Sequence, residues 1–108
     1  YILNANSSIP KLFKNKKKEI GIRIPNNNIP REVVKELGNP IVTTSVKDED
    51  MVIEYSTYPE LIYEHFGKLV DMVIDGGYGE AVPSTIVDCT QNTPEIIRKG
   101  KGDITPFL

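Results

Sequence analysis

Two arginines stand where strands are expected to end, and their side chains suit anionic ligands. Arg23 follows an alternating apolar segment and precedes Pro25, and Arg98 is followed by Lys99 and Gly100. A guanidinium at a strand end can hold a carboxylate or a phosphate through two parallel hydrogen bonds. The competing interpretation is a solvated side chain. The pattern alone favours solvation for Arg23 and leaves both interpretations of Arg98 open.

Two groups of hydroxyl side chains could serve the same kind of ligand. Thr43, Thr44 and Ser45 close a β-branched segment, and Ser84 and Thr85 follow a proline. Ligands of open α/β folds bind at the carboxyl ends of strands, and hydroxyl and amide donors at a strand start can bind an anion. Ordinary strand propensity explains the first group as well, and the pattern alone favours it. A strand that begins after a loop explains the second.

A run of lysines is the clearest electrostatic signal. Residues 1–23 hold six basic residues and one acidic residue, whereas residues 24–108 hold seven and fourteen, so a net charge of −2 divides into +5 and −7. Lysines interleaved with Phe13 could neutralise nucleic-acid phosphates, each with a salt-dependent gain. A flexible solvated loop is the alternative, which the pattern slightly favours. The candidate RNA contacts are Lys11, Lys14, Lys16, Lys17 and Lys18.

Several familiar motifs are absent from the sequence. The single Cys89 excludes an internal disulfide and a cysteine-based zinc site, and the single His65 has no matching partner for a metal site or a catalytic dyad. The acidic run at residues 48–50 lacks the glycine and distal glutamate of a calcium loop. The glycines at 76–79 match neither a P-loop nor a dinucleotide fingerprint. We therefore assign no catalytic residue and no metal site.

Length and composition indicate one domain, or a piece of one, in a soluble globular protein. The chain has 108 residues, of which 39% are hydrophobic and 26% charged. No apolar run approaches the roughly 20 residues that span a bilayer. The N-terminus shows no Met and no secretory signal, so such a signal is absent or was removed. We expect a cytoplasmic protein with no membrane partner.

The apolar pattern predicts an α/β fold, a twisted mixed sheet with flanking helices. Ile20, Ile22 and Ile24 alternate with other residues, which predicts a half-buried strand. Gly38 is suited to end a short helix, and residues 57–60 have the form of a capping box. The chain opens directly in an apolar segment, which favours a fragment. Strands are expected at residues 1–5, 19–24, 40–46, 70–74, 84–90 and 95–98, and helices at 30–37 and 57–69.

Four segments in this order resemble the YrdC/YciO-like family. They are residues 21–25, 40–45, 84–88 and 97–100, and the opening residues 1–5 resemble the strand before a lysine-containing loop in that family. The resemblance covers nearly the whole chain. Each motif is weak alone, but four in order at fitting spacings are fairly specific. The ending at residues 98–108 is most similar to the YciO branch.

The resemblance implies a twisted α/β sheet with a large, positively charged concave surface. The characterised members are threonylcarbamoyl-AMP synthases, which convert L-threonine, bicarbonate and ATP to threonylcarbamoyl-adenylate and pyrophosphate for threonylcarbamoyladenosine formation on tRNA. Members are also described as binding double-stranded RNA. By resemblance ATP and Mg²⁺ are the family ligands. Arg23 and Arg98 would hold anionic groups, Ser45 and Ser84 would donate hydrogen bonds, and Thr44 and Thr85 are second choices.

The sequence departs from the synthase pattern in two ways. The synthase Lys-x-Arg pair lies upstream of the strand that begins this chain, so residues 1–108 lack it. Where synthases have Ser-x-Asn, this chain has Ser45, Val46 and Lys47, and a lysine adds a charge and cannot accept a hydrogen bond. We therefore expect residues 1–108 to form the C-terminal portion of a single YrdC/YciO-like domain that lacks part of its nucleotide site.

Two functions stay open at this point. The first is a portion of a threonylcarbamoyl-AMP synthase-like enzyme, inactive as this fragment. The second is a non-catalytic YciO-like protein that binds RNA or a nucleotide through its basic face. A stable proteolytic core without activity is a third interpretation. Apolar strand edges also lead us to expect a homodimer.

Overall fold

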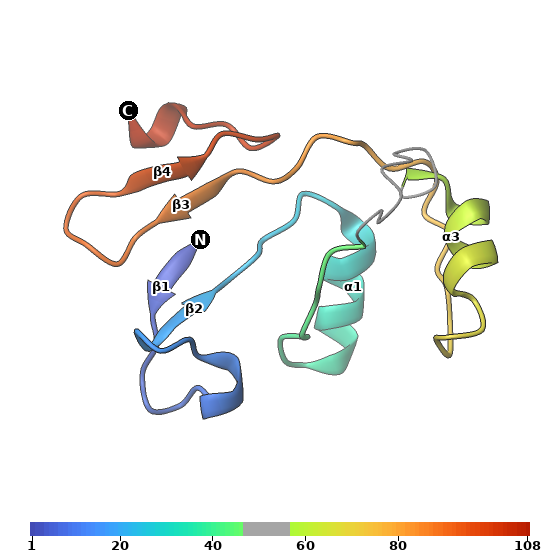
Figure 1. Ribbon diagram of the computed structural model, residues 1–108, viewed down its shortest axis with the longest axis horizontal. Helices are drawn as coiled ribbons and strands as arrows, with labels where there is room; N and C mark the ends of the chain where they lie inside the picture. The colour runs from blue at the N-terminus through green and yellow to red at the C-terminus, as the bar shows by residue number, and fades with distance from the viewer. Residues whose placement is uncertain (47–56) are drawn as a thin grey trace. The chain divides into compact units, whose positions relative to one another are not determined.

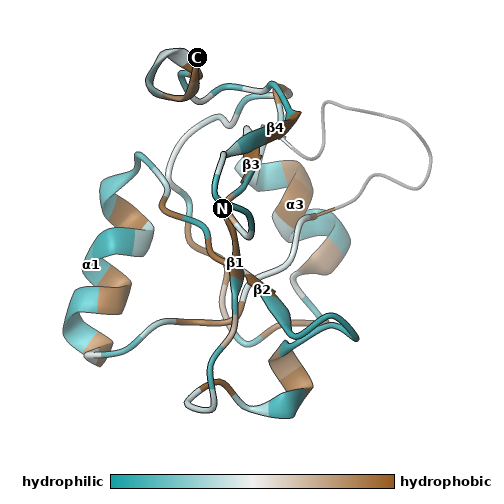
Figure 2. Cartoon of the chain, turned by 90° about the vertical axis from the view of Figure 1, so that its left-hand side faces the viewer, coloured by the Kyte–Doolittle hydropathy of each residue, from teal (hydrophilic) through white to brown (hydrophobic). Residues whose placement is uncertain are grey.

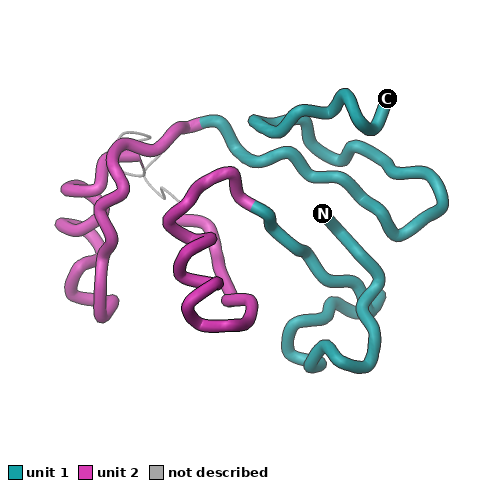
Figure 3. The backbone as a smooth tube through the Cα atoms, turned by 180° about the vertical axis from the view of Figure 1, so that it is seen from behind, with its two compact units in different colours: residues 1–24, 82–108 teal, residues 25–81 magenta. Residues whose placement is uncertain are grey.

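The chain forms two compact units in the computed structural model, which describes residues 1–46 and 57–108. Unit 1 joins the two ends of the chain, residues 1–24 and 82–108, and unit 2 comprises residues 25–81 (Figure 3). The sheet belongs to unit 1 and both described α-helices belong to unit 2. The predicted α/β class is therefore confirmed.

A mixed sheet of four short strands builds unit 1, in the order β2-β1-β3-β4 (Figure 1). Neighbours β1 and β2 are antiparallel, as are β3 and β4, whereas β1 and β3 run parallel. The strands predicted at 84–90 and 95–98 form a hairpin, and its ladder shifts register between Ile86 and Val87. The strands are β1 (Ile2–Asn4), β2 (Glu19–Gly21), β3 (Ile86–Asp88) and β4 (Glu95–Arg98).

The parallel pair joins the first residues of the chain to its last third. Ile2 lies opposite Asp88, and the amide of Cys89 donates to the Ile2 carbonyl at 2.9 Å. Next to this bond, the Asn4 Nδ2 donates to the Thr90 carbonyl at 3.1 Å. These bonds make one sheet from two hairpins that are far apart in the sequence.

One face of the sheet is apolar because the strands alternate. Leu3 pairs with Ile20 and Val87 pairs with Ile96, and paired residues point to the same face. Val87 is only 3% exposed and forms the buried centre of unit 1. At the margin, the Phe107 ring packs edge-on against Tyr1 with 6.1 Å between ring centroids. Phe107 belongs to the short 3-10 helix η2 (Thr105–Phe107).

The first helix of unit 2 ends at the predicted glycine and begins two residues before its predicted start. Helix α1 (Asn28–Leu37) begins after Asn27, whose Oδ1 accepts from the Ile29 amide at 2.9 Å. At its other end Gly38 adopts a left-handed φ of 84° and donates to the Val34 carbonyl. Polar and apolar bands alternate along α1 in Figure 2. The predicted helix and its terminal glycine are confirmed.

The second helix begins later than the predicted capping box requires. Helix α3 (Pro59–Phe66) has Tyr58 as its N-cap, and the Tyr58 side chain makes no capping hydrogen bond. A proline favours the first helical position because it has no amide to satisfy and its φ is fixed. Glu60 is therefore the second helical residue, not the third that a box starting at Thr57 needs. The predicted box is wrong.

Two predicted strands are not formed in the described part of the chain. Residues 40–46 and 70–74 are irregular, and their apolar side chains include Val42 at 75% and Met72 at 75% exposed. A run of β-branched residues fits a pleated, half-buried surface, but it forms a strand only where a partner strand is available. Beyond residue 74 the Gly77 amide donates to Asp75 Oδ1 at 2.9 Å and closes a short turn. The acidic run at 48–50 lies outside the described residues.

Within residues 1–46 and 57–108, no helix is long and apolar enough to cross a bilayer.

We expect Val87→Ala to lower the free energy of unfolding by about 2 kcal/mol, because it leaves a void at the buried centre of the sheet. Val42→Ala is the matched control, since that side chain is 75% exposed. Chemical denaturation followed by circular dichroism measures both variants. Equal stability of the two variants would contradict the packing described for Val87.

Candidate anion-binding site

Two of the predicted site residues meet at the end of the β3–β4 hairpin. Arg98 is the last residue of β4, and the register places it opposite Ile86, so Ser84 lies just beyond β3 at the same end. The Arg98 Nε donates to the Ser84 carbonyl at 2.9 Å, and its Nη2 donates to Ser84 Oγ at 3.2 Å. Both residues are exposed. The two bonds fix the direction of the guanidinium at an open edge.

Thr85 holds the glycine segment against this edge. Its Oγ1 accepts from the Gly100 amide at 3.0 Å and donates to the Gly102 carbonyl at 2.7 Å. The Lys101 amide adds a bond to the Pro83 carbonyl at 2.9 Å. Both hydrogen bonds of the Thr85 hydroxyl are made within the protein. Thr85 is therefore a positioning residue beneath the site.

The edge presents hydrogen-bond donors and positive charge. A guanidinium carries five N–H groups, and Arg98 uses Nε and one Nη2 donor on Ser84. The Ser84 oxygen accepts from Arg98, which leaves its O–H to donate outward. Lys99 follows in sequence with its side chain exposed. None of Ser84, Arg98 and Lys99 carries a carboxylate. Their hydrogen-bond donors therefore suit a phosphate or carboxylate ligand.

Arg23 lies at the same end of the sheet, on the other side of unit 1. It is two residues beyond Gly21, and the register brings this level of the sheet beside Ile86 and therefore Arg98. Three strand spacings separate β2 from β4, which is about 14 Å. This is a separation of backbones, and two arginine side chains can bridge it. The two arginines therefore suit one anionic group or two groups of one extended ligand.

Ser45 and Thr44 lie elsewhere in the chain. Both are exposed in unit 2, on the irregular segment after Pro40, whereas Arg23, Ser84 and Arg98 belong to unit 1. Lys47, which stands where the synthase pattern has Asn, lies outside the described residues. The structure therefore brings together Ser84 and Arg98 by direct contact and aligns Arg23 with them by register.

The lysine run forms the loop that joins β1 to β2. It begins with the 3-10 helix η1 (Lys11–Phe13), and residues 5–18 contain no acidic residue. Leu12 is 85% and Phe13 43% exposed. Lys14 is half-buried and the other four lysines are exposed. The predicted exposed loop is confirmed, with more local order than its composition indicates.

An acidic side chain beside this loop was not predicted as a structural feature. The Thr90 hydroxyl and amide donate to Asp88 Oδ1 at 2.6 and 2.9 Å, which lowers the pKa of Asp88. The charge of Lys17 acts in the same direction. Asp103 and Thr105 repeat the arrangement, and the pKa of Asp103 is lowered for the same reason. The Asp-x-Thr spacing was the signal available in the sequence.

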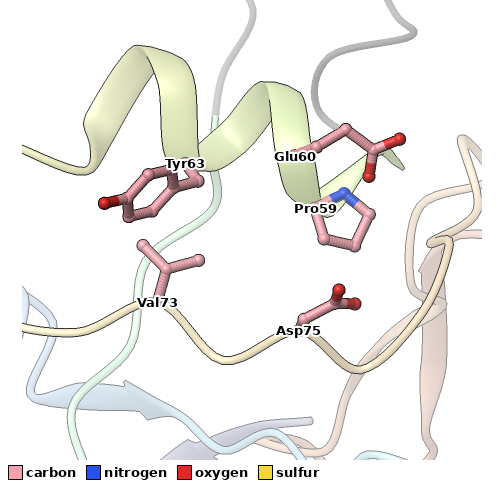
Figure 4. A pocket seen from close by; sticks show the side chains of 5 residues that line it. All are labelled: Pro59, Glu60, Tyr63, Val73 and Asp75. Carbon is pink, nitrogen blue, oxygen red and sulfur yellow. The ribbon is translucent and has the colours of Figure 1, made fainter.

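A hollow in unit 2 is unsuited to an anion. It measures about 290 Å³ and lies between α3 and the segment at 73–75 (Figure 4). Glu60 and Asp75 supply two carboxylates to its lining, beside Pro59, Tyr63 and Val73. A phosphate or carboxylate would be repelled there.

Comparison with known proteins shows a match along nearly the whole chain. The Sua5/YciO/YrdC family model, described as "Telomere recombination", matches residues 1–100. "Uncharacterized protein YciO" of Escherichia coli strain K12 is 38% identical over 109 residues, covering 100% of this chain and 52% of that protein. An "Uncharacterized protein" of Haemophilus influenzae is 36% identical, covering 100% of this chain and 53% of its own length.

A solved structure matches as well. The crystal structure of E. coli YciO superposes with a TM-score of 0.85 at 36% identity, covering 99% of this chain and 52% of that one. The chain therefore spans about half the length of the curated relatives it matches.

We expect Gly100→Ala to destabilise unit 1 by about 2 kcal/mol, because the new Cβ would lie 2.5 Å from the Ser84 carbonyl carbon and closer still to the Pro83 oxygen. Gly21→Ala is the control, since a Cβ there meets nothing within 4 Å. Urea denaturation compares the two variants. A Gly100→Ala protein as stable as the Gly21→Ala protein would refute the close approach.

Proposed function

Because this chain belongs to the Sua5/YciO/YrdC family, we propose that its Ser84–Arg98 edge binds an anionic group of a nucleotide or of threonine. In this proposal the chain is a portion of a threonylcarbamoyl-AMP synthase-like protein of tRNA threonylcarbamoyladenosine biosynthesis. One observation carries the proposal: the Arg98 guanidinium donates two hydrogen bonds to Ser84, at 2.9 and 3.2 Å, and these bonds fix its orientation.

The chemistry of the synthase reaction makes sense of such an edge. A threonylcarbamate oxygen attacks the α-phosphorus of ATP, the bond to pyrophosphate breaks, and negative charge shifts onto the leaving oxygens. Catalysis of phosphoryl-type transfer rests on positioning and on cations and donors around the phosphates. Arg98 would hold one anionic group, and the Ser84 O–H would donate to it. Arg23, whose backbone lies about 14 Å away across the sheet, would hold the same group or a neighbouring one of the ligand.

Magnesium fits this arrangement as an ion held by the nucleotide. Among residues 1–46 and 57–108 no group of three or more His, Cys, Asp or Glu side chains could hold a metal ion. Mg²⁺ at nucleotide sites is usually bound through phosphates and waters with one or two carboxylates. When bound, it would neutralise phosphate charge, and the residues described here would orient the ligand.

The length of the relatives sets what the chain can do alone. It matches 52% of E. coli YciO, so residues of a whole domain outside this match would complete a synthase site. We propose that residues 1–108 bind ATP weakly and do not form the adenylate. This division agrees with the absence of a Lys-x-Arg pair from residues 1–108.

We expect Arg98→Ala to weaken binding of Mg-ATP roughly tenfold or more, since a charge-assisted hydrogen bond is worth about 1.5–3 kcal/mol. Arg31→Ala is a closely matched control. Arg31 is also exposed, and it also donates Nε to a carbonyl, of Pro25, and Nη2 to a side-chain oxygen, of Asn26. Isothermal titration with and without L-threonine and bicarbonate measures the effect.

Two results would count against this function. Equal ATP affinity in the Arg98→Ala and Arg31→Ala proteins would remove Arg98 from the site. Absence of ATP binding by the unaltered chain at millimolar nucleotide would reject the nucleotide site in residues 1–108 as a whole.

The lysine loop supports a second candidate, RNA binding without catalysis. Residues 5–18 carry five lysines and no acid, and four of those lysines are exposed. Such a loop is suited to contact phosphates without reading sequence. Phe13, 43% exposed, offers a ring on which a base could stack.

Replacing Lys16, Lys17 and Lys18 by alanine together tests this candidate. The slope of log affinity against log salt should fall by about 0.7–0.9 for each phosphate that is no longer neutralised, so we expect a decrease of about 2–3. Fluorescence anisotropy with a 20-base-pair RNA at several KCl concentrations gives the slope. An unchanged slope would show that these lysines do not touch the RNA.

A further inference from the structure

We infer that residues 15–18 form a turn ordered in advance for a phosphate backbone, and that Asn15 is its positioning residue. The inference rests on the second function proposed above, RNA binding by the lysine loop. The new element is Asn15, an uncharged residue. In this inference Asn15 keeps the backbone of the three consecutive lysines in a fixed conformation.

The Asn15 side chain caps the turn from inside. Its Oδ1 accepts from the amides of Lys17 and Glu19 at 3.0 and 2.9 Å. Its Nδ2 donates to Glu19 Oε1 at 3.0 Å. All three polar bonds of this amide group therefore stay within five residues of the chain and close the turn around it.

Backbone bonds complete the same turn. The Lys18 amide donates to the Asn15 carbonyl at 3.0 Å, and the Asn15 amide donates to the Glu19 carbonyl at 3.2 Å. Lys18 adopts a φ of 58°, a left-handed conformation that a lysine rarely takes without support. The Lys18 carbonyl accepts from the Ala5 amide at 2.8 Å, which ties the turn to the end of β1.

This order matters because three adjacent lysines repel one another. In a flexible loop their side chains would spread apart, and bringing them to one surface on binding would cost conformational entropy. The Asn15 hydrogen bonds order the turn when the protein folds, so this loss of entropy does not fall on RNA binding. Lys16, Lys17 and Lys18 are exposed on a backbone that is already fixed.

The carboxylates beside the turn accept hydrogen bonds from neutral groups, and Asp88 also feels the charge of Lys17. Glu19 accepts from Asn15, and Asp88 accepts from the Thr90 hydroxyl and amide. Hydrogen bonds of this kind hold the carboxylates in place, and the lysines outnumber them. The turn therefore presents a net positive surface to a phosphate chain.

The turn also lies at the opposite end of the sheet from Arg98. Asn4 pairs with Glu19 and donates to Thr90 at one end, whereas Arg98 pairs with Ile86 at the other. Loss of RNA binding through the turn should therefore leave ATP binding at the Ser84–Arg98 edge unchanged.

The test uses the full 108-residue chain with Asn15→Ala, Asn15→Ser and Asn6→Ala. Asn6 is the matched control because its Oδ1 also accepts from an amide two residues on, that of Ser8 at 3.0 Å, in the same loop. The probe is a 20-base-pair RNA, followed by anisotropy across a KCl series. Net charge is the same in all variants, so electrostatics alone predicts no change.

We expect Asn15→Ala to weaken RNA binding about tenfold and to lower the salt slope by about 1, the decrease that follows when one fewer phosphate is neutralised. Asn15→Ser should recover part of both, because a hydroxyl can accept from the amide two residues on. Asn6→Ala should match the unaltered chain. If the alanine variant loses its circular dichroism signal, the serine variant alone carries the comparison.

Two outcomes would overturn the inference, and they differ. If the unaltered chain fails to bind the RNA at low salt, the second proposed function fails and this inference with it. If the chain binds but the Asn15 variants match Asn6→Ala in affinity and slope, RNA binding stands and the role of Asn15 is wrong.

Discussion

The parallel pairing of β1 with β3 is the constraint on which unit 1 depends. Parallel strands cannot be joined by a tight turn, so they need a long connection between them. Here that connection includes all of unit 2, residues 25–81. The Cys89 amide and the Asn4 side chain hold the pair together at 2.9 and 3.1 Å. Without this pairing the chain has two separate hairpins, one with the lysine loop and one with Arg98, and β3 has no neighbour on the side of β1.

The sheet explains why the two proposed anion-binding edges are compatible with a net charge of −2. The strand register separates the lysine turn from Arg98 along the sheet, so positive charge gathers at both ends without direct repulsion between them. At each end an uncharged residue orders the basic segment: Asn15 in the lysine turn and Ser84 beside Arg98. Specific placement of charge, not total charge, therefore determines what each edge can bind.

The sequence was sufficient for those elements whose pattern alone defines them. The alternation at residues 19–24 predicted a strand, which forms over Glu19–Gly21, and Gly38 predicted the end of α1. Residues 40–46 and 70–74 were not, because an apolar run is equally compatible with a strand and with an irregular segment that lacks a partner. The capping box at Thr57 failed since Pro59 displaced the helix start by one residue.

The site shows the same division between local and distant information. Arg98 and Ser84 were predicted individually, but their contact depends on the register of a hairpin with a shifted ladder, which no local pattern reveals. Asn15 could not be singled out, because an asparagine in a lysine-rich loop is typical of a solvated polar residue. Its importance comes from where the two amides that its oxygen binds lie in space. Charged residues can be counted in a sequence, whereas the uncharged residues that orient them are recognised only once the geometry of the turn is known.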